Sequence, residues 1–276
     1  MKTLYITDLD GTLLDSEAQL TKKSKKLLSD AIDKGIDFTV ATARTFATVM
    51  NMFRGIRLKH PLILMNGVML YDPLKCKIIS YRNIEKTAAK KVFDIYRRHK
   101  NFPLVYRCVD DMLEIEYYNT DNPYQAKYIG KRNEVDGKRF IYSPKFTFEG
   151  KREIIYIVTL DKYERIEPLY RDMIKTDGIS CAFYRDNYTD CYFLEIFAEN
   201  TSKASALTEV KEIVGADKIV AFGDNLNDID MFRISDEAYA VENACNELKA
   251  VSTAVIGSNT EDSVAKFIFE RSEKKQ

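Results

Sequence analysis

Two aspartates separated by one residue follow the first apolar stretch of the chain. The segment DLDGT places Asp8 and Asp10 directly after KTLYIT (2–7), and Gly11 lets the chain bend. In open α/β sheets the functional crevice lies outside the carboxyl ends of the strands. One carboxylate there can attack a phosphoryl group and form an aspartyl-phosphate, while a second protonates the leaving group and then deprotonates water. The structural alternative is a surface Asx turn, which Asp-Gly pairs commonly form.

A second polar segment, GDNLND (223–228), follows the apolar stretch KIVAF (218–222). Asp224 stands at the end of that predicted strand, and Asn227 and Asp228 share a face if a helix begins there. Oxygen ligands in this arrangement suit a hard cation such as Mg²⁺. The alternative is an acid-rich helix N-terminus, where the helix dipole favours negative charge without a metal.

The two acidic segments strengthen each other if both strands lie in one sheet, because Asp8, Asp10, Asp224 and Asp228 then converge. Two like charges about 4 Å apart cost roughly 4 kcal/mol at an effective dielectric near 20. Such a cluster persists only with protonation or a bound cation. A bound divalent metal is the simplest way to stabilise such a cluster, and we expect Mg²⁺.

Two further side chains are candidates for an anion site. Thr42 in VATAR follows the second predicted strand and offers a hydroxyl and a backbone N–H. Lys203 in NTSKASAL opens a predicted helix, where its ammonium and the first helix N–H groups together attract anions. Read singly, Thr42 is equally a helix cap and Lys203 a solvated lysine.

The elements that must position these residues alternate between strands and helices at both ends of the chain, whereas strands outnumber helices in the tyrosine-rich middle. We therefore predict an α/β fold with a Rossmann-like, doubly wound parallel sheet, formed by residues 1–82 and 193–276. Residues 83–192 are predicted to form an inserted α+β domain. The sequence periodicity predicts strands at 2–7, 36–41, 62–65, 218–222, 238–241 and 253–256, and helices at about 20–35, 45–54, 85–99, 161–176 and 202–215.

Composition excludes several classes of protein. The 276 residues are 45% hydrophobic with zero net charge, which is ordinary for a soluble globular chain and gives no general attraction to nucleic acid. No apolar run approaches the ~20 residues that span a bilayer, and no signal-peptide pattern precedes the first acid. The five cysteines form no CxxC pair, so a disulfide framework or zinc ribbon is not expected. We expect a cytoplasmic protein with neither a membrane nor a nucleic acid as partner.

Taken together, the motifs resemble the haloacid dehalogenase superfamily, in particular its Cof-type phosphatases with a large C2-type cap. They follow the order of that family, cover the two predicted core segments, and leave the insert where this subgroup carries its cap. The matching residues are DLDGTLL (8–14), Thr42 and Arg44 in VATAR, Asn66-Gly67, Lys203 in SKASAL, GDNLND (223–228) and Asn243 in VENA.

The resemblance implies a role for each matched position. Asp8 would be the nucleophile and Asp10 the general acid and base, with Thr42 and Lys203 binding the phosphoryl group at the catalytic centre. Mg²⁺ would be held by Asp8, the backbone carbonyl of Asp10, and Asp224, with Asp228 and Asn227 ligating or supporting it. Further substrate or phosphate contacts are implied at Leu9, Gly11, Ala43, Arg44, Asn66, Gly67, Asn227 and Asn243.

Three positions depart from the family pattern. Ala43 and Ala204 stand where the family often has Gly, which is tolerable if neither backbone needs a positive φ. Glu242 stands where the family usually has Gly before the asparagine, and an extra acid there could weaken phosphate binding or read a substrate hydroxyl. Asp10 and GDNLND nevertheless favour phosphoryl chemistry over cleavage of a carbon–halogen bond.

We therefore expect a Mg²⁺-dependent phosphomonoesterase that hydrolyses a small phosphorylated metabolite, with a sugar phosphate as the favoured class, in a monomer or homodimer. A phosphomutase of the same fold would instead return the phosphoryl group to another hydroxyl. A catalytically silent protein that binds a phosphorylated ligand would keep the fold without turnover. Nucleic-acid binding through the tyrosine-rich insert is disfavoured, because its basic patches are short and interleaved with acids.

Overall fold

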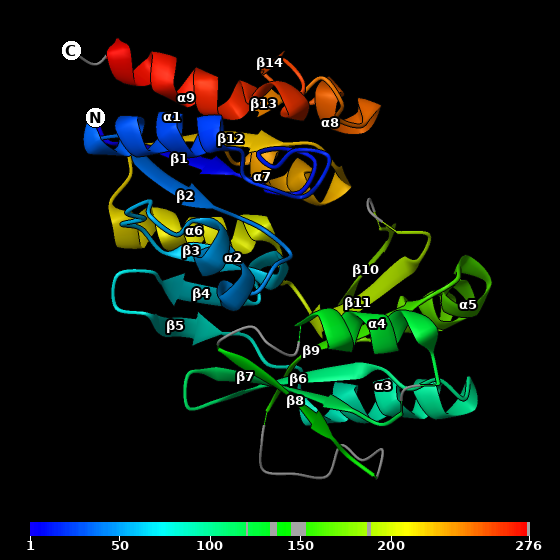
Figure 1. The fold of residues 1–276 in the computed structure, drawn as a ribbon. Coiled ribbons are helices and arrows are strands. Elements are labelled where there is room, and N and C mark those ends of the chain that lie inside the picture. Colours follow the sequence, from blue (N-terminus) through cyan, green and yellow to red (C-terminus); the bar gives the residue numbers. More distant parts are fainter. Residues whose placement is uncertain (120, 133–136, 145–152, 187–188, 275–276) are drawn as a thin grey trace. The chain divides into compact units, whose positions relative to one another are not determined.

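The computed structural model describes residues 1–119, 121–132, 137–144, 153–186 and 189–274 (Figure 1). The chain divides into two compact units, one formed by Met1–Ser80 with Ser202–Gln276 and the other by Tyr81–Thr201. No helix among the described residues has the length and apolarity needed to span a bilayer.

The first unit is built on a parallel sheet, and the predicted α/β fold is confirmed. Its central strand β1 pairs on one side with β12 and on the other with β2, so all three carboxyl ends lie at one edge. The central strands β12, β1 and β2 are short apolar runs that are mostly buried on both faces, as in other parallel sheets, whereas the edge strand β14 is exposed. In sheet order they are β14 (Ala254–Val255), β13 (Glu237–Ala240), β12 (Lys218–Gly223), β1 (Thr3–Thr7) and β2 (Asp37–Val40).

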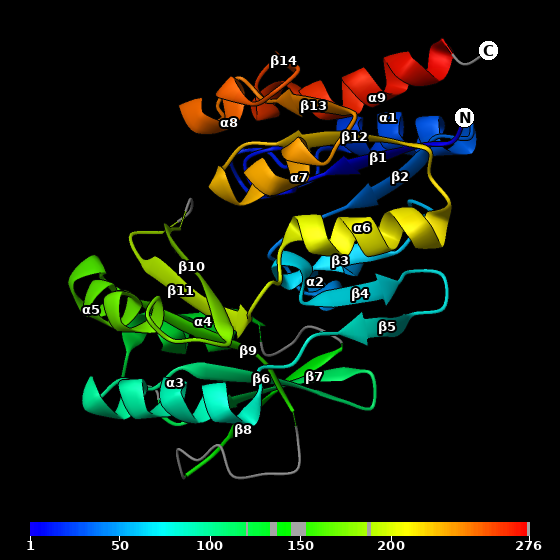
Figure 2. The same cartoon turned by 180° about the vertical axis from the view of Figure 1, so that it is seen from behind.

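Helices cover both faces of this sheet. α1 (Lys22–Asp33) and α9 (Ser263–Glu273) pack side by side on one face, whereas α6 (Lys203–Val214) and α7 (Ile229–Arg233) lie on the other (Figures 1 and 2). The Thr21 hydroxyl caps α1, since it accepts the Ser24 N–H at 2.9 Å. The remaining helices of this unit are α2 (Phe46–Met52) and α8 (Asn246–Ala250), with the 3₁₀ turns η2 (Leu226–Asp228) and η3 (Asn259–Glu261).

A second, three-stranded sheet in the same unit has the order β3 (Leu62–Leu64), β4 (Met69–Asp72) and β5 (Lys77–Tyr81). A bridge from Ala41 to Ile63 joins it to the end of β2. Asn66 and Gly67 lie in the 3₁₀ turn η1 (Met65–Gly67), where both have positive φ. β4 and β5 are not among the strands predicted from the sequence, and β5 alternates exposed and half-buried residues instead of forming a buried apolar run.

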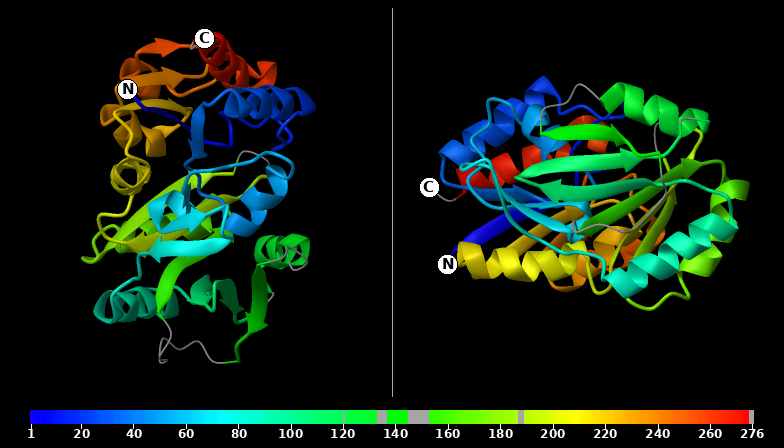
Figure 3. Two further views of the ribbon diagram at one scale, coloured as in Figure 1. Left: turned by 90° about the vertical axis from the view of Figure 1, so that its left-hand side faces the viewer. Right: turned by 90° about the horizontal axis from the view of Figure 1, so that it is seen from below.

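The second unit is a six-stranded sheet with a core of its own. α3 (Lys86–Arg98) and α5 (Tyr163–Met173) pack on one face over a continuous apolar cluster (Figure 3). α4 (Pro123–Arg132), which the sequence analysis did not predict, lies on the opposite face, where the hydroxyls of Tyr128 and Tyr106 are 2.9 Å apart. In sheet order the strands are β10 (Ile179–Arg185), β11 (Tyr192–Ala198), β9 (Ile154–Asp161), β6 (Leu104–Val109), β7 (Met112–Tyr117) and β8 (Lys138–Tyr142).

The boundary expected between residues 192 and 193 falls inside β11. This strand is antiparallel to both β10 and β9, and its ladder hydrogen bonds tie it to the second unit. The chain therefore returns to the first unit after Thr201, just before α6 begins.

Candidate active site

The site is built where β1 and β12 end side by side. Thr7 pairs with Phe222 in the ladder, and the next N–H, that of Asp8, donates to the Phe222 carbonyl at 2.9 Å. Asp8 and Asp224 therefore follow adjacent parallel strands at the same edge of the sheet. This is the edge at which open α/β sheets carry their ligands.

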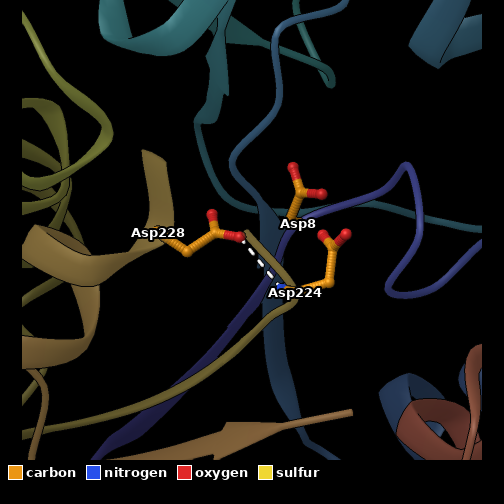
Figure 4. Close-up of side chains that lie close together, drawn as sticks. All are labelled: Asp8, Asp224 and Asp228. Carbon is orange, nitrogen blue, oxygen red and sulfur yellow. Dashed lines mark hydrogen bonds between the residues drawn. The ribbon is translucent and has the colours of Figure 1, made fainter. Parts of the chain in front are cut away.

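Three carboxylates meet at this edge. Oxygen atoms of Asp8, Asp224 and Asp228 all lie within 4.8 Å of one another (Figure 4). Asp228 sits at the end of η2, and its Oδ2 accepts the backbone N–H groups of Asp224 at 3.1 Å and Asn225 at 3.2 Å. The tight turn thus folds GDNLND back on itself and buries the Asp228 side chain completely. The expected convergence is confirmed for these three acids.

Lys203 supplies a cation to this group. Its Nζ donates to Asp8 Oδ1 at 2.6 Å and to Asp228 Oδ1 at 2.7 Å, and its side chain is 1% exposed. Burial alone would lower the pKa of Lys203, but the Asp228 and Asp8 carboxylates raise it above its ordinary value, so the ammonium stays charged. The alternative of a solvated surface lysine is therefore wrong.

The environment of the acids favours their neutral forms. Burial raises the pKa of Asp224 to about 7, and the Asp228 carboxylate adds to this, while a 2.9 Å hydrogen bond from the Thr12 hydroxyl opposes it. Burial also raises the pKa of Asp8 well above its ordinary value, against the opposing effect of Lys203. Thr12 has no assigned role in the sequence analysis, although it is the last residue of DLDGT; only the fold brings its hydroxyl to Asp224.

The chemistry of this donor set fits a divalent cation. With all groups ionised, one ammonium cannot balance three carboxylates, and every available ligand atom is a hard oxygen, the kind that Mg²⁺ prefers. The backbone is also shaped around the acids. A Cβ at Gly11 would lie 2.4 Å from Asp224 Oδ2, so the DLDGT turn approaches the second acidic segment as closely as only glycine permits.

The Asp10 carboxylate does not join the three acids. Instead, both of its oxygens accept hydrogen bonds from Arg44, Oδ2 from Nε at 2.6 Å and Oδ1 from Nη2 at 2.5 Å. Asp10 stays close enough to raise the pKa of Asp8 and Asp224, but its carboxylate turns to the guanidinium. The expectation that four carboxylates converge is therefore wrong for Asp10, because Arg44 competes for it.

The other residues expected on the second and third strands form a connected set of loops. The Thr42 N–H donates to the Ile63 carbonyl at 2.9 Å, and the Thr42 hydroxyl accepts the Arg44 N–H at 3.2 Å. The Asn66 N–H returns to the Thr42 carbonyl, and Asn66 Oδ1 accepts the Asn227 side-chain N–H at 3.3 Å. These contacts tie the loops after β2, β3 and β12 together at one edge.

Asn243 holds the first loop from the other side. Its Nδ2 donates to the Gly11 carbonyl at 2.8 Å, and its Oδ1 accepts the Asn259 N–H at 3.1 Å. The neighbouring Glu242 is exposed. The expectation for the two alanines is confirmed, since neither Ala43 nor Ala204 has a positive φ.

Replacing Gly11 with Ala should displace Asp224. At Gly11 φ is +79°, which costs an L residue about 1–2 kcal/mol, and the new Cβ would also clash with the Asp224 carboxylate. Gly35 is a matched control, because its φ is +89° and a Cβ there would meet nothing within 4 Å. Denaturant unfolding with and without Mg²⁺ should show a similar conformational cost in both variants but a lost Mg²⁺ response only in Gly11→Ala. An equal Mg²⁺ response in both variants would contradict the close approach.

The metal-free protein should lose stability as the pH rises from about 4 to about 7. The folded-state pKa of Asp224 is about 7 and that of Asp8 is also raised, against 3.8 for both groups ordinarily. The folded protein therefore holds more protons than the unfolded chain in this interval, and stability that is full below the unfolded pKa is lost as the pH rises through the folded pKa. Denaturant unfolding in EDTA at pH 5, 6, 7 and 8 measures this. Added Mg²⁺ should stabilise more at pH 8 than at pH 5, because it competes with protons; a metal-free stability that rises over the interval would contradict it.

Comparison with known proteins places almost the whole chain in one family. The family model for haloacid dehalogenase-like hydrolases matches residues 5–268. The chain is 28% identical to the 5-amino-6-(5-phospho-D-ribitylamino)uracil phosphatase YwtE of Bacillus subtilis, over 97% of both chains. It is 27% identical to the pyridoxal phosphate phosphatase YbhA of Escherichia coli, over 95% of this chain and 96% of that one.

Solved structures share the fold over the same length. TM0651 from Thermotoga maritima superposes with a TM-score of 0.77 and 25% identity, covering 98% of this chain and 97% of that chain. A haloacid dehalogenase-like hydrolase from Bacteroides thetaiotaomicron gives a TM-score of 0.79 at 20% identity, covering 98% and 99%. Both units of the chain therefore belong to one known architecture.

Proposed function

The chain belongs to the haloacid dehalogenase-like hydrolases of the Cof type and is a phosphoric monoester hydrolase, and from this premise we propose a Mg²⁺-dependent phosphatase of small phosphorylated metabolites. The observation that carries the proposal is the Asp8 carboxylate at the end of β1. Its Oδ1 lies 2.6 Å from the Nζ of the buried Lys203. Oxygen atoms of Asp8, Asp224 and Asp228 also lie within 4.8 Å of one another. A fixed, desolvated carboxylate beside a cation is equipped to meet a phosphoryl group.

In the first half of the proposed reaction, an Asp8 oxygen attacks the phosphorus atom. The new bond from Asp8 to phosphorus forms as the bond from phosphorus to the ester oxygen breaks. A proton passes from the Asp10 carboxyl to the leaving oxygen, so the product departs as an alcohol. The phosphoryl group is then held as an aspartyl-phosphate on Asp8.

In the second half, a water oxygen attacks the same phosphorus atom and the bond to Asp8 breaks. Asp10, now a carboxylate, takes the proton from the water. Inorganic phosphate leaves, and both aspartates return to their starting states. Lys203 keeps its charge throughout, because the carboxylates around it raise its pKa.

We propose that Asp8, Asp224 and the backbone carbonyl of Asp10 hold the metal, with Asp228 and Asn227 supporting it. When bound, Mg²⁺ offsets the negative charge of the acids and of the phosphoryl oxygens. Thr42 and Lys203 are proposed phosphoryl ligands. The remaining proposed contacts are those implied by the resemblance at Leu9, Gly11, Ala43, Asn66, Gly67 and Asn243.

The substrate class is supported by the relatives. The two curated relatives described above are named for different small phosphate esters at nearly equal identity, so identity does not choose between esters. We propose a small phosphorylated metabolite as substrate, with sugar phosphates as the first class to test, and the unit Tyr81–Thr201 as the cap that selects it. A cytoplasmic location is proposed as well, in keeping with five cysteines that form no disulfide.

Phosphate release from a panel of sugar phosphates, nucleotides and cofactor phosphates, each with Mg²⁺ and with EDTA, tests the proposal. Release that needs Mg²⁺ and ranks the esters is the expected result. Conversion of an ester without release of phosphate would instead indicate a phosphomutase. No conversion of any ester at high enzyme concentration would contradict the proposal and favour a protein that only binds phosphorylated ligands.

A further inference from the structure

Arg44 and Asp10 form a side-on pair in which both partners are fixed. The Nε and Nη2 groups of Arg44 donate to the two Asp10 oxygens at 2.6 and 2.5 Å. A planar guanidinium that meets both oxygens of a carboxylate sets the plane and direction of that carboxylate, which a single hydrogen bond does not. The pair joins the turn after β1 to the loop after β2.

The backbone of Arg44 is anchored on both sides. Its N–H donates to the Thr42 hydroxyl at 3.2 Å, and its carbonyl accepts the Met65 N–H at 3.1 Å. On the far edge of the guanidinium, Nη1 lies 3.7 Å from the Met52 sulfur. The Nε–Nη2 edge of Arg44 is therefore presented to Asp10 by a loop that is itself held to β3 and η1.

Asp10 is held as firmly by its own turn. The Leu9 carbonyl accepts the N–H groups of Thr12, Leu13 and Leu14 at 2.9–3.2 Å, which closes the chain immediately after Asp10. The Asp10 side chain is 27% exposed and that of Arg44 19%, whereas the side chain of Asp8, the proposed nucleophile, is 9% exposed. The pair is thus open enough for a reacting group to reach Asp10, beside a nucleophile that is buried.

We propose that Arg44 is a positioning residue for Asp10 and is not a ligand of the phosphoryl group. The inference rests on the proposed function, in which Asp10 transfers the proton, and it replaces the substrate contact that the resemblance implies for Arg44. Arg44 holds one carboxylate in a fixed direction for proton transfer to the leaving oxygen and from the attacking water. Without Arg44, Asp10 loses the two hydrogen bonds that set the plane of its carboxylate, and a misplacement of about 1 Å is enough to cost on the order of 100-fold in rate.

Two esters with different leaving groups separate the two roles. The phenolate of p-nitrophenyl phosphate departs without a proton, whereas the alkoxide of a sugar phosphate needs one from Asp10. Arg44→Met removes the guanidinium, and Arg44→Lys keeps the cation but loses the planar fork. Arg54→Met is the matched control, because Arg54 is exposed just after α2. Steady-state kinetics with Mg²⁺ are measured on p-nitrophenyl phosphate and on the best sugar phosphate of the panel.

For a positioning role, Arg44→Met should lower kcat/KM on the sugar phosphate on the order of 100-fold while changing kcat/KM on p-nitrophenyl phosphate by less than about 5-fold, because kcat/KM covers only the steps up to departure of the leaving group. Hydrolysis of the shared aspartyl-phosphate also needs Asp10, so kcat should fall on both esters. Arg44→Lys should not restore the lost rate, because an ammonium cannot hold both oxygens in one plane. In an Asp10→Asn background, Arg44→Met should add little, since the residue that Arg44 positions is already inactive.

Equal losses of kcat/KM on both esters, with weaker inhibition by inorganic phosphate, would overturn the inference and make Arg44 a phosphoryl ligand. Full rescue by Arg44→Lys would overturn it as well. Wild-type protein that converts no ester of the panel would refute the proposed function itself, so wild-type turnover is measured before the variants are compared. The melting temperature and its Mg²⁺ shift verify that each variant is folded, and Arg44→Lys carries the test if Arg44→Met does not fold.

Discussion

Replacing Asp8 with Asn should abolish phosphate release and leave the protein folded. An amide oxygen cannot form the acyl phosphate, so the loss in kcat should be on the order of 10⁴-fold or more. The fold should tolerate the change, because burial and the neighbouring acids disfavour the Asp8 charge in the metal-free protein. Melting in EDTA should therefore occur at the wild-type temperature or above it, although Lys203 loses one partner.

The control for this variant is Asp230→Asn, which makes the same chemical change on an exposed side chain of α7. It should keep wild-type turnover and Mg²⁺ response. Phosphate release and thermal melting in EDTA and in Mg²⁺ measure both variants. Near-normal turnover in Asp8→Asn, on protein free of residual wild type, would show that Asp8 is not the nucleophile and that the buried acids have only a structural role.

Replacing Lys203 with Met should be strongly destabilising as well as inactivating. Lys203 is the cation that contacts both Asp8 and Asp228, and it is 1% exposed. Removing one partner from a buried ion pair typically costs about 3–5 kcal/mol, because the remaining charge keeps no compensation. The free energy of unfolding in EDTA should fall by about that amount at pH 8.

The loss in Lys203→Met should shrink at acid pH. Burial raises the pKa of Asp224 to about 7 and also raises that of Asp8, so the missing ammonium leaves fewer charged carboxylates at pH 5 than at pH 8. Lys23→Met, on the exposed face of α1, is the control and should change stability by less than about 0.5 kcal/mol at either pH. A loss in Lys203→Met that is the same at both values would show that packing of the side chain, and not its charge, matters.

The sequence predicts the part of the site that follows from strand ends. Asp8 and Asp224 come directly after short apolar strands, and parallel pairing of β1 with β12 is enough to bring them together. Lys203 is predictable as the start of a helix, but its full burial between two acids is not. That burial depends on how α6 packs against the sheet.

The pairing of Asp10 with Arg44 is not visible in the sequence. The two residues stand 34 positions apart in loops whose directions are fixed by other contacts, such as those of Leu9 and Thr42. Nothing in the spacing of Asp8 and Asp10 says that Asp8 pairs with Lys203 and Asp10 with Arg44. The role of Thr12 cannot be predicted from the sequence for the same reason, since its hydroxyl reaches Asp224 only through the turn that Gly11 permits.

The same distinction holds for the fold. Thr21 caps α1 through a contact with a residue three positions away, so the start of this helix can be predicted from the sequence. The end of the second unit is set by the pairing of β11 with β9, a contact between residues far apart in the chain, and β11 itself looks like any apolar strand. Contacts between residues that are close in the sequence can thus be predicted from it, whereas the pairing of distant segments cannot.

The central claim, a covalent phosphoryl group on Asp8, is tested most directly by trapping it. Asp10→Asn with p-nitrophenyl phosphate is suited to this, because the phenolate leaves without an acid while hydrolysis of the acyl phosphate lacks its base. The reaction is stopped by a rapid acid quench, and the protein is then reduced with borohydride, which converts an aspartyl-phosphate to homoserine. Peptide mass spectrometry identifies the residue at position 8.

We expect a burst of about one p-nitrophenolate per active site, with homoserine at position 8 in matching amount and only when Mg²⁺ is present. The same treatment of Asp8→Asn should give neither. Steady release of p-nitrophenolate without a burst, with residue 8 unmodified or another residue converted, would contradict a reaction through Asp8.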